Sequence, residues 1–180
     1  MSGDRFLANT WTGRVFNPLR PDPAVICIED IAHSLSGASR YLRHTDKPYS
    51  TAQHCVILSH LVAPALALKA LLHDGDEAYI GDVIAPLKTQ SLMGPYRALS
   101  SLWIATIFVK FGLSAEFPDE VHALDVQLRI NEVRDLFRVV PDWALAGTPL
   151  PLSGRPIVPW SADEAESRFL ARFKALQEGA

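Results

Sequence analysis

One stretch of the chain, Leu71-Leu72-His73-Asp74-Gly75-Asp76-Glu77-Ala78-Tyr79-Ile80-Gly81-Asp82, joins the end of an apolar helix to a His-Asp pair and further carboxylates. Successive helical residues are about 100° apart, so Leu66, Ala70, His73 and Glu77 fall on one helical face. This places metal-ligand and proton-acceptor groups on a stripe that faces the core. For the His-Asp pair alone, an ordinary helix C-terminus with solvated acids is an alternative.

Length and composition narrow the class of protein. The 180 residues suffice for one buried core, and 48% of them are hydrophobic. The net charge of −3 comes without a basic cluster, so we expect neither nucleic acid nor a membrane surface as a partner. No apolar run approaches the roughly 20 residues of a membrane span, and Met1 to Trp11 lack the pattern of a signal peptide. We therefore expect a cytoplasmic protein in which Cys27 and Cys55 are buried, reduced thiols.

The pattern of helix signals predicts an all-α fold, a single helical bundle with a short N-terminal hairpin or extended arm. Residues 6–16 suggest the hairpin, with Thr12-Gly13 as its turn. Capping boxes at Ser50 and Ser161 predict helix starts. We expect one domain over 1–180, made of an N-terminal arm (1–28), a metal-binding helical core (29–140), a Pro-rich loop (141–160) that is long enough to cover a site or a subunit contact, and a C-terminal helix (161–180).

Two further polar residues point toward the predicted core. On the helix that begins after Ser50, His54 lies within the apolar face. A helix from Pro118 to about Val140 has Asp125 inside its apolar arc. A buried lone carboxylate needs a partner, which is either a metal ion or Arg129 four residues later. The remaining polar residues of this helix are expected on a solvated side: Gln127, Asn131, Arg134 and Arg138.

Three separate helices thus each present a polar group on an apolar face: His54, His73 with Asp74, and Asp125. Two imidazoles and two carboxylates suit one divalent metal ion such as Zn²⁺, Mn²⁺, Co²⁺, Fe²⁺ or Mg²⁺. The wide spacing in sequence excludes a zinc finger or ribbon, whose ligands are clustered.

The same residues resemble the HD-domain phosphohydrolase superfamily. The match to short bacterial HD proteins, which include the 5′-deoxynucleotidases, extends from Ala70 through Asp82 to Pro86-Leu87-Lys88. Three other segments resemble phage-type dATP triphosphohydrolases: Trp11-Thr12-Gly13-Arg14, Ile28-Glu29-Asp30-Ile31-Ala32-His33 and Tyr49-Ser50-Thr51-Ala52-Gln53-His54. The resemblance covers residues 10 to 140.

The resemblance implies a metal-dependent phosphohydrolase of (deoxy)nucleotides in which water attacks a phosphoester or phosphoanhydride. It implies a role for each matching residue, with His54, His73, Asp74 and Asp125 as metal ligands and Glu77 as the acid–base group. Asp82 would be a second acid–base group or would hydrogen-bond the sugar. Arg40 and Lys88 would contact phosphate, and Trp11 and Tyr41 would be platforms for the base. Tyr41 stands where the monophosphate-specific branch has tryptophan, so both monophosphates and triphosphates remain candidate substrates.

Several of these residues have simpler alternatives. Asp82 matches a helix N-cap after Gly81, Trp11 matches a core residue, and Arg40 and Lys88 match surface cations. For the whole chain, the alternatives are a non-catalytic HD module that binds nucleotide or a protein partner around a structural metal, and a purely structural helical protein. The resemblance also leads us to expect a homo-oligomer.

Overall fold

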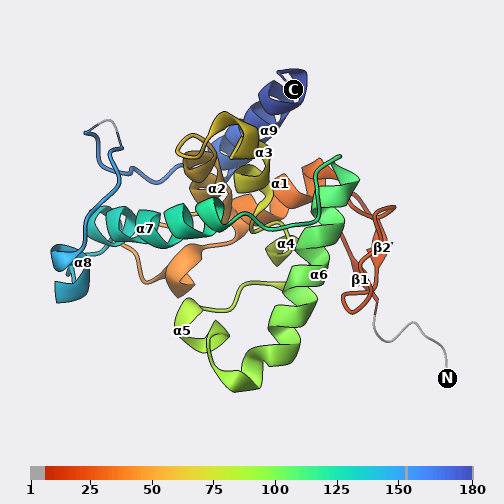
Figure 1. Cartoon of the computed structure of the whole chain (residues 1–180), viewed down its shortest axis with the longest axis horizontal. Coiled ribbons are helices and arrows are strands. Elements are labelled where there is room, and N and C mark those ends of the chain that lie inside the picture. Colours follow the sequence, from red (N-terminus) through yellow and green to blue (C-terminus); the bar gives the residue numbers. More distant parts are fainter. Residues whose placement is uncertain (1–6, 153, 180) are drawn as a thin grey trace.

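The computed structural model describes residues 7–152 and 154–179, and it confirms the predicted fold class. Helices pack into a bundle, and a two-stranded hairpin lies at one side (Figure 1). The elements, in chain order, are β1 Ala8–Asn9, β2 Val15–Phe16, α1 Ile28–Gly37, η2 Arg40–Arg43, α2 Thr51–Ser59, η3 Pro64–Leu66, α3 Ala67–Leu72, α4 Glu77–Ile80, α5 Ala85–Lys88, η4 Ser91–Met93, α6 Gly94–Lys110, α7 Asp119–Leu136, α8 Asp142–Ala146 and α9 Ala162–Glu178. This arrangement is consistent with an HD-type fold.

The N-terminal hairpin forms where the sequence predicts it, although Phe6 lies outside the described residues. Strands β1 and β2 are antiparallel, with Ala8 opposite Phe16, and Gly13 in the connecting turn has φ of 84°. Left-handed backbone is easiest for glycine, which explains why a glycine occupies this turn. Thr12 donates its backbone N–H and its hydroxyl to the carboxylate of Asp30, both at 2.8 Å, which ties the hairpin to α1.

The two predicted capping boxes start helices in the structure. Ser50 accepts a hydrogen bond from the backbone N–H of Gln53 at the start of α2, and Ser161 accepts one from Glu164 at the start of α9. Each serine satisfies a backbone donor that the helix itself leaves without a partner. Helix α2 is thereby fixed at the end from which His54 projects.

The helices pack around side chains that are excluded from solvent. Helix α9 lies against α1, α2 and α3, and α2 also packs on α3 and α7. Fully buried side chains from these elements include Ile31, Leu58, Leu71, Leu128 and Phe169. Helix α9 contacts α2, which carries His54, and α3, which precedes His73. Its packing therefore supports the two helices that position these histidines.

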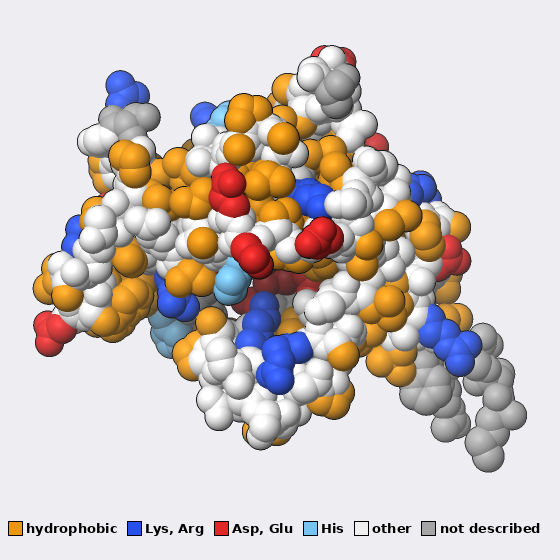
Figure 2. All heavy atoms as spheres, viewed as in Figure 1, with side chains coloured by type: hydrophobic (Ala, Val, Ile, Leu, Met, Phe, Trp, Pro, Cys, Tyr) orange, Lys and Arg blue, Asp and Glu red, His pale blue; other side chains and the backbone are white. Residues whose placement is uncertain are grey.

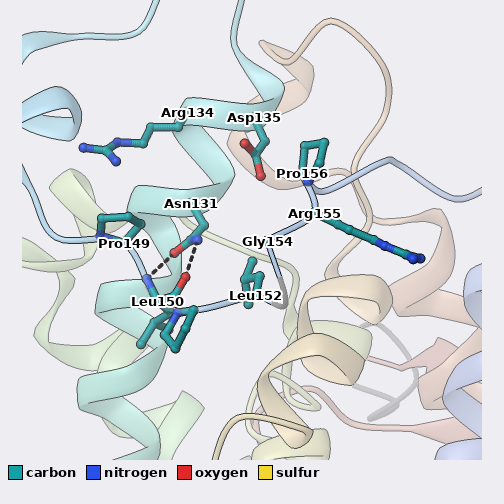
Figure 3. Close-up of a pocket in the computed structure, with 10 residues that line it drawn as sticks. Asn131, Arg134, Asp135, Pro149, Leu150, Leu152, Gly154, Arg155 and Pro156 are labelled. Atoms are coloured by element: carbon teal, nitrogen blue, oxygen red, sulfur yellow. Dashed lines mark hydrogen bonds between the residues drawn. The ribbon is translucent and has the colours of Figure 1, made fainter.

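Helix α7 differs from the prediction at its end and on one side. It stops at Leu136 instead of near Val140, and Asn131, expected in solvent, is only 8% exposed. The Pro-rich loop covers this side, because the Asn131 amide exchanges two hydrogen bonds with the backbone of Leu150 (Figure 3). Arg134 donates to three carbonyl groups in and after α8. The described part of this loop packs on α7, and its polar anchors are among the residues that we expected to be solvated.

Helix α6 has one buried and one exposed face. The segment Ser91–Lys110 meets the length and composition of a membrane span, contrary to our expectation from the sequence, with a mean hydropathy of 1.2 and 22% of its residues buried. Its inner face, including Trp103, Ile107 and Phe108, belongs to the core of the bundle. Helices in protein cores can have the same length and apolar composition, so these two properties alone do not make the segment a membrane span.

Candidate metal centre

His54 and His73 face each other across the middle of the bundle. Their Nε2 atoms are 3.3 Å apart, and both residues are buried. The Nδ1 atom of His54 lies 2.5 Å from the Glu132 carboxylate, and that of His73 lies 2.8 Å from the backbone carbonyl of Ala70. Because a carboxylate or carbonyl oxygen only accepts hydrogen bonds, each neutral imidazole carries its proton on Nδ1. Each Nε2 therefore presents a lone pair to the other.

Carboxylates complete the surroundings of these two lone pairs. An Asp74 oxygen is 3.2 Å from Nε2 of His73, and an Asp125 oxygen is 3.0 Å from Nε2 of His54. Two ligand atoms bound to one cation at about 2.1 Å stand roughly 3.0–3.5 Å apart. His54, His73 and Asp74 thus form a group that can hold a metal ion, and Asp125 lies beside it. The predicted Asp125–Arg129 alternative does not form within the described residues, because Asp125 pairs with His54 and Arg40.

The cluster assembles from helix ends and one helix face. His54 lies in α2, His73 follows the last residue of α3, and Asp125 lies in α7. Residues 73–76 form a turn, so Glu77 begins a new short helix instead of continuing the helix that leads to His73. The turn nevertheless keeps Glu77 near the cluster, where its carboxylate accepts a hydrogen bond from Thr51 at 3.3 Å.

Glu77 is a buried carboxyl group among other acids. It is 7% exposed, and Lys88 approaches it at 3.4 Å. Burial first, and then the negative charges of Asp74 and Asp82, raise the pKa of Glu77 well above its ordinary value, although Lys88 opposes them. A carboxyl group with a raised pKa is a stronger base than a free one, which suits acid–base chemistry.

The basic residues lie around the same recess. Arg40 contacts Asp74 at 3.1 Å and Asp125 at 3.8 Å, and Lys88 pairs with Asp82 at 2.9 Å. Asp82 therefore bonds to Lys88, and helix α5 has Ile84 at its N-cap, so the N-cap alternative for Asp82 is wrong. Figure 2 shows a recess near the centre of this face, over α4 and between α7 and α5, with acidic side chains on its floor and basic side chains at its rim.

The neighbours of the two histidines also set how protons compete with a cation. Burial works to lower the pKa of His73, but the charge of Asp74 outweighs burial and raises it well above the ordinary value. A proton and a metal ion compete for the same Nε2 lone pair, so acid opposes metal binding. The negative groups around the cluster outnumber Arg40 and Lys88 and favour a cation: Asp74, Glu77, Asp82, Asp125 and Glu132.

The two aromatic residues predicted to contact the base have other partners. Tyr41 donates its hydroxyl to Glu132, and its ring packs edge-on against Phe137. Trp11 is 61% exposed and stacks on His33, with ring centroids 4.4 Å apart, so it is not a core residue either. Among the described contacts, none joins Trp11 to the His/Asp cluster.

Glu132 is the residue at this centre that sequence reasoning does not single out. It has no exposed surface, and it accepts hydrogen bonds from His54, Tyr41 and Tyr49. Its position seven residues after Asp125 is a usable signal, since two helical turns bring residues seven apart onto nearly the same face.

A pocket of about 400 Å³ lies apart from this centre, between α7 and residues 149–152 and 154–156 (Figure 3). Its lining shares no residue with the His/Asp cluster, and Asn131, Arg134 and Asp135 already bond to backbone groups of the loop region. The His/Asp cluster, and not this pocket, is therefore the candidate functional site.

Comparison with known proteins gives relatives but no activity. No protein-family model matches the chain. A protein of Escherichia coli (strain K12), named uncharacterized protein YfdR, is 35% identical over 173 residues, which are 94% of this chain and 94% of the relative. An uncharacterized protein of Rhodobacter capsulatus is 38% identical over 116 residues, or 59% of each chain.

Proposed function

The chain belongs to the family of the Escherichia coli protein YfdR, and we propose that it is a metal-dependent phosphohydrolase of the HD type that acts on (deoxy)nucleotides. One observation carries this proposal. The Nε2 atoms of two histidines lie 3.3 Å apart beside two carboxylates, and in the neutral form with the proton on Nδ1 their lone pairs cannot hydrogen-bond to each other. A divalent cation between them would accept both lone pairs.

His54, His73, Asp74 and Asp125 would hold the cation. When bound, such an ion supplies Lewis acidity toward a phosphoryl oxygen and toward water. Glu77 lies in the same recess and would take the proton of the attacking water, because burial and the neighbouring acids raise its pKa and so make its carboxylate a stronger base. Thr51 and Lys88 contact its two oxygens and would keep the carboxyl group oriented.

Arg40 and Lys88 would recognise the phosphate groups. The planar guanidinium of Arg40 suits two phosphate oxygens at once, and the Lys88 ammonium adds a point charge farther along a phosphate chain. Asp82 holds Lys88 at 2.9 Å and would fix the position of that charge. Trp11 is left out of the proposed base site, because it stacks on His33.

A product screen tests the proposal. Purified protein is incubated with dNMPs and dNTPs in Mn²⁺, Co²⁺, Zn²⁺ or Mg²⁺, and chromatography identifies phosphate, pyrophosphate or triphosphate as the product. We expect at least one metal–nucleotide pair to be hydrolysed, and Glu77→Gln to lower kcat about 10²–10⁴-fold. Glu29→Gln, at an exposed position in α1, is the matched control and should keep full activity. If the metal-loaded protein cleaves no nucleotide, the non-catalytic metal module replaces the hydrolase.

We also propose that the chain forms a homo-oligomer in the cytoplasm. Exposed apolar side chains on one side of α6 and in the preceding turn support assembly, namely Leu92, Leu102 and Val109 at 71%, 52% and 57% exposure. Light scattering on the purified protein measures the assembled mass, and a monomer at micromolar concentration would overturn this part of the proposal.

A further inference from the structure

Glu132 is a buried carboxylate without solvent contact. It is 0% exposed, and its hydrogen-bond donors are the hydroxyls of Tyr41 and Tyr49 and Nδ1 of His54. The Nε atom of Arg40 lies 3.5 Å away. A charge buried so completely is costly unless it is hydrogen-bonded and paired. Three donors hydrogen-bond to the Glu132 carboxylate, and the positive charge of Arg40 lies beside it without a hydrogen bond from Nε.

The contacts are divided between the two carboxylate oxygens. Oε1 accepts from Nδ1 of His54 at 2.5 Å and from Tyr49 at 2.9 Å, whereas Oε2 accepts from Tyr41 and faces Arg40. Each carboxylate oxygen thus accepts a hydrogen bond from one tyrosine hydroxyl, which fixes the orientation of the carboxylate. Glu132 and Asp125 lie two turns apart on α7. One helix therefore supplies the candidate ligand Asp125 and also the carboxylate that contacts Nδ1 of the candidate ligand His54.

From this geometry we infer that Glu132 is a positioning residue for the metal centre, which keeps the proton of His54 on Nδ1 and thereby directs the Nε2 lone pair toward the cation. The inference rests on the proposed metal site. Carboxylates that bond to the second nitrogen of a ligating histidine fix its orientation and raise its basicity, and their loss typically weakens metal binding 10–100-fold.

A purely structural role, in which Glu132 only neutralises Arg40, makes a different prediction. The Arg40 guanidinium also contacts Asp74 and Asp125, so loss of Glu132 would leave it paired. In that case Glu132→Gln would change protein stability and leave the metal affinity of the folded protein unaltered. The His54 contact is the one that separates the two roles.

The test measures metal binding, not hydrolysis. Co²⁺ is titrated into metal-free wild type and Glu132→Gln, with calorimetry for the dissociation constant and the visible Co²⁺ spectrum for the coordination. Circular dichroism establishes that each variant is folded. We expect Glu132→Gln to weaken Co²⁺ binding 10–100-fold and to alter the spectrum.

Glu166→Gln is the matched control, because Glu166 also contacts Nδ1 of a histidine, His33, at 3.0 Å, away from the cluster. It should bind Co²⁺ as the wild type does. Tyr49→Phe keeps the charge of Glu132 but removes one of its donors, so it should weaken binding by a smaller factor. This variant also decides the question if Glu132→Gln does not fold.

Each outcome has a separate meaning. Unchanged Co²⁺ affinity in folded Glu132→Gln, or in Tyr49→Phe when Glu132→Gln does not fold, overturns the positioning role. Failure of the wild type to bind any divalent metal overturns both this inference and the proposed function. Tight metal binding without nucleotide hydrolysis overturns only the hydrolase, and the Glu132 comparison still supports or contradicts the inference.

Discussion

Asp30 joins the N-terminal hairpin to α1, and its hydrogen bonds make that junction sensitive to acid. The carboxylate is 3% exposed and accepts from Thr12 and from the Cys27 thiol. Burial works to raise the pKa of Asp30, but the hydrogen bonds from Cys27 and Thr12 outweigh burial and lower it from 3.8. Because the pKa of Asp30 is lower in the folded than in the unfolded protein, its ionised carboxylate stabilises the fold above about pH 3.8. This contribution is lost as the pH falls through the pKa of the folded state.

Asp30→Asn should therefore destabilise the protein by about 1–3 kcal/mol at pH 7, since buried groups lose a charged acceptor. The difference from wild type should shrink when both proteins are unfolded by urea at pH 3. Asp22→Asn, at an exposed position, is the control and should differ little from wild type at either pH. A difference that stays constant between pH 7 and pH 3 would contradict the assigned role of the Asp30 charge.

At the scale of single residues, sequence periodicity predicts which way a side chain points, but it does not predict which groups will surround that side chain. The 100° rotation per residue predicts that His54 points inward, and the structure confirms its complete burial. The same periodicity places Glu132 on nearly the same face as Asp125 but does not assign it a role, because a glutamate near Arg129 also matches an ordinary surface pair. Its three donors come from residues 41, 49 and 54, so only the tertiary fold reveals why its charge is buried.

Among the elements that the structure describes, the turn η2 has an unusual backbone. Tyr41, Leu42 and Arg43 have φ of 58°, 50° and 65°, although none of them is glycine. A left-handed conformation costs roughly 1–2 kcal/mol for each such residue. The turn delivers Arg40 to Asp74 and the Tyr41 hydroxyl to Glu132, so strain and site contacts occur in the same four residues. No glycine or asparagine in this segment signals the left-handed backbone, so the sequence does not indicate this conformation.

Leu42→Gly should relieve part of this strain. Leu42 is 63% exposed, so its side chain contributes little packing, and glycine adopts positive φ without a steric penalty. After the larger chain entropy of glycine is subtracted, we expect the free energy of unfolding to rise by about 0.5–1 kcal/mol. Leu92→Gly, at a 71% exposed position without positive φ, is the control and should be neutral or destabilising. Urea denaturation measures both, and a loss of stability in Leu42→Gly would show that the turn is not strained.

The helices with capping boxes are predicted well, and the Pro-rich loop is not. Ser50 and Ser161 use local hydrogen bonds, which the sequence encodes within four residues. The loop instead gains its place through long-range bonds such as Asn131 to Leu150, which no local pattern contains. The same reason explains the wrong assignment of Asn131 to a solvated side of α7.

At the scale of the whole molecule, the C-terminal helix braces the candidate metal centre although it contributes no ligand. Helix α9 packs on α1, α2 and α3, and Arg172 donates to the hydroxyl and the carbonyl of Ser59 at the end of α2. The resemblance to HD proteins stops near residue 140 and therefore does not predict this role. The amphipathic pattern of α9 explains its position, because Phe169 lies in the core and Leu170 and Phe173 pack against that core.

Phe169→Ala tests how far the core depends on α9. The Phe169 side chain is completely buried, and its removal leaves a cavity between α9 and the helices that carry the site. We expect a loss of about 3–5 kcal/mol in the free energy of unfolding, measured by urea denaturation. Phe117→Ala is the matched control, since Phe117 is 39% exposed, and it should cost clearly less. A loss for Phe169→Ala as small as that expected for an exposed side chain would mean that α9 is not part of the cooperative core, and α1 and α7 would then have to support α2 and α3.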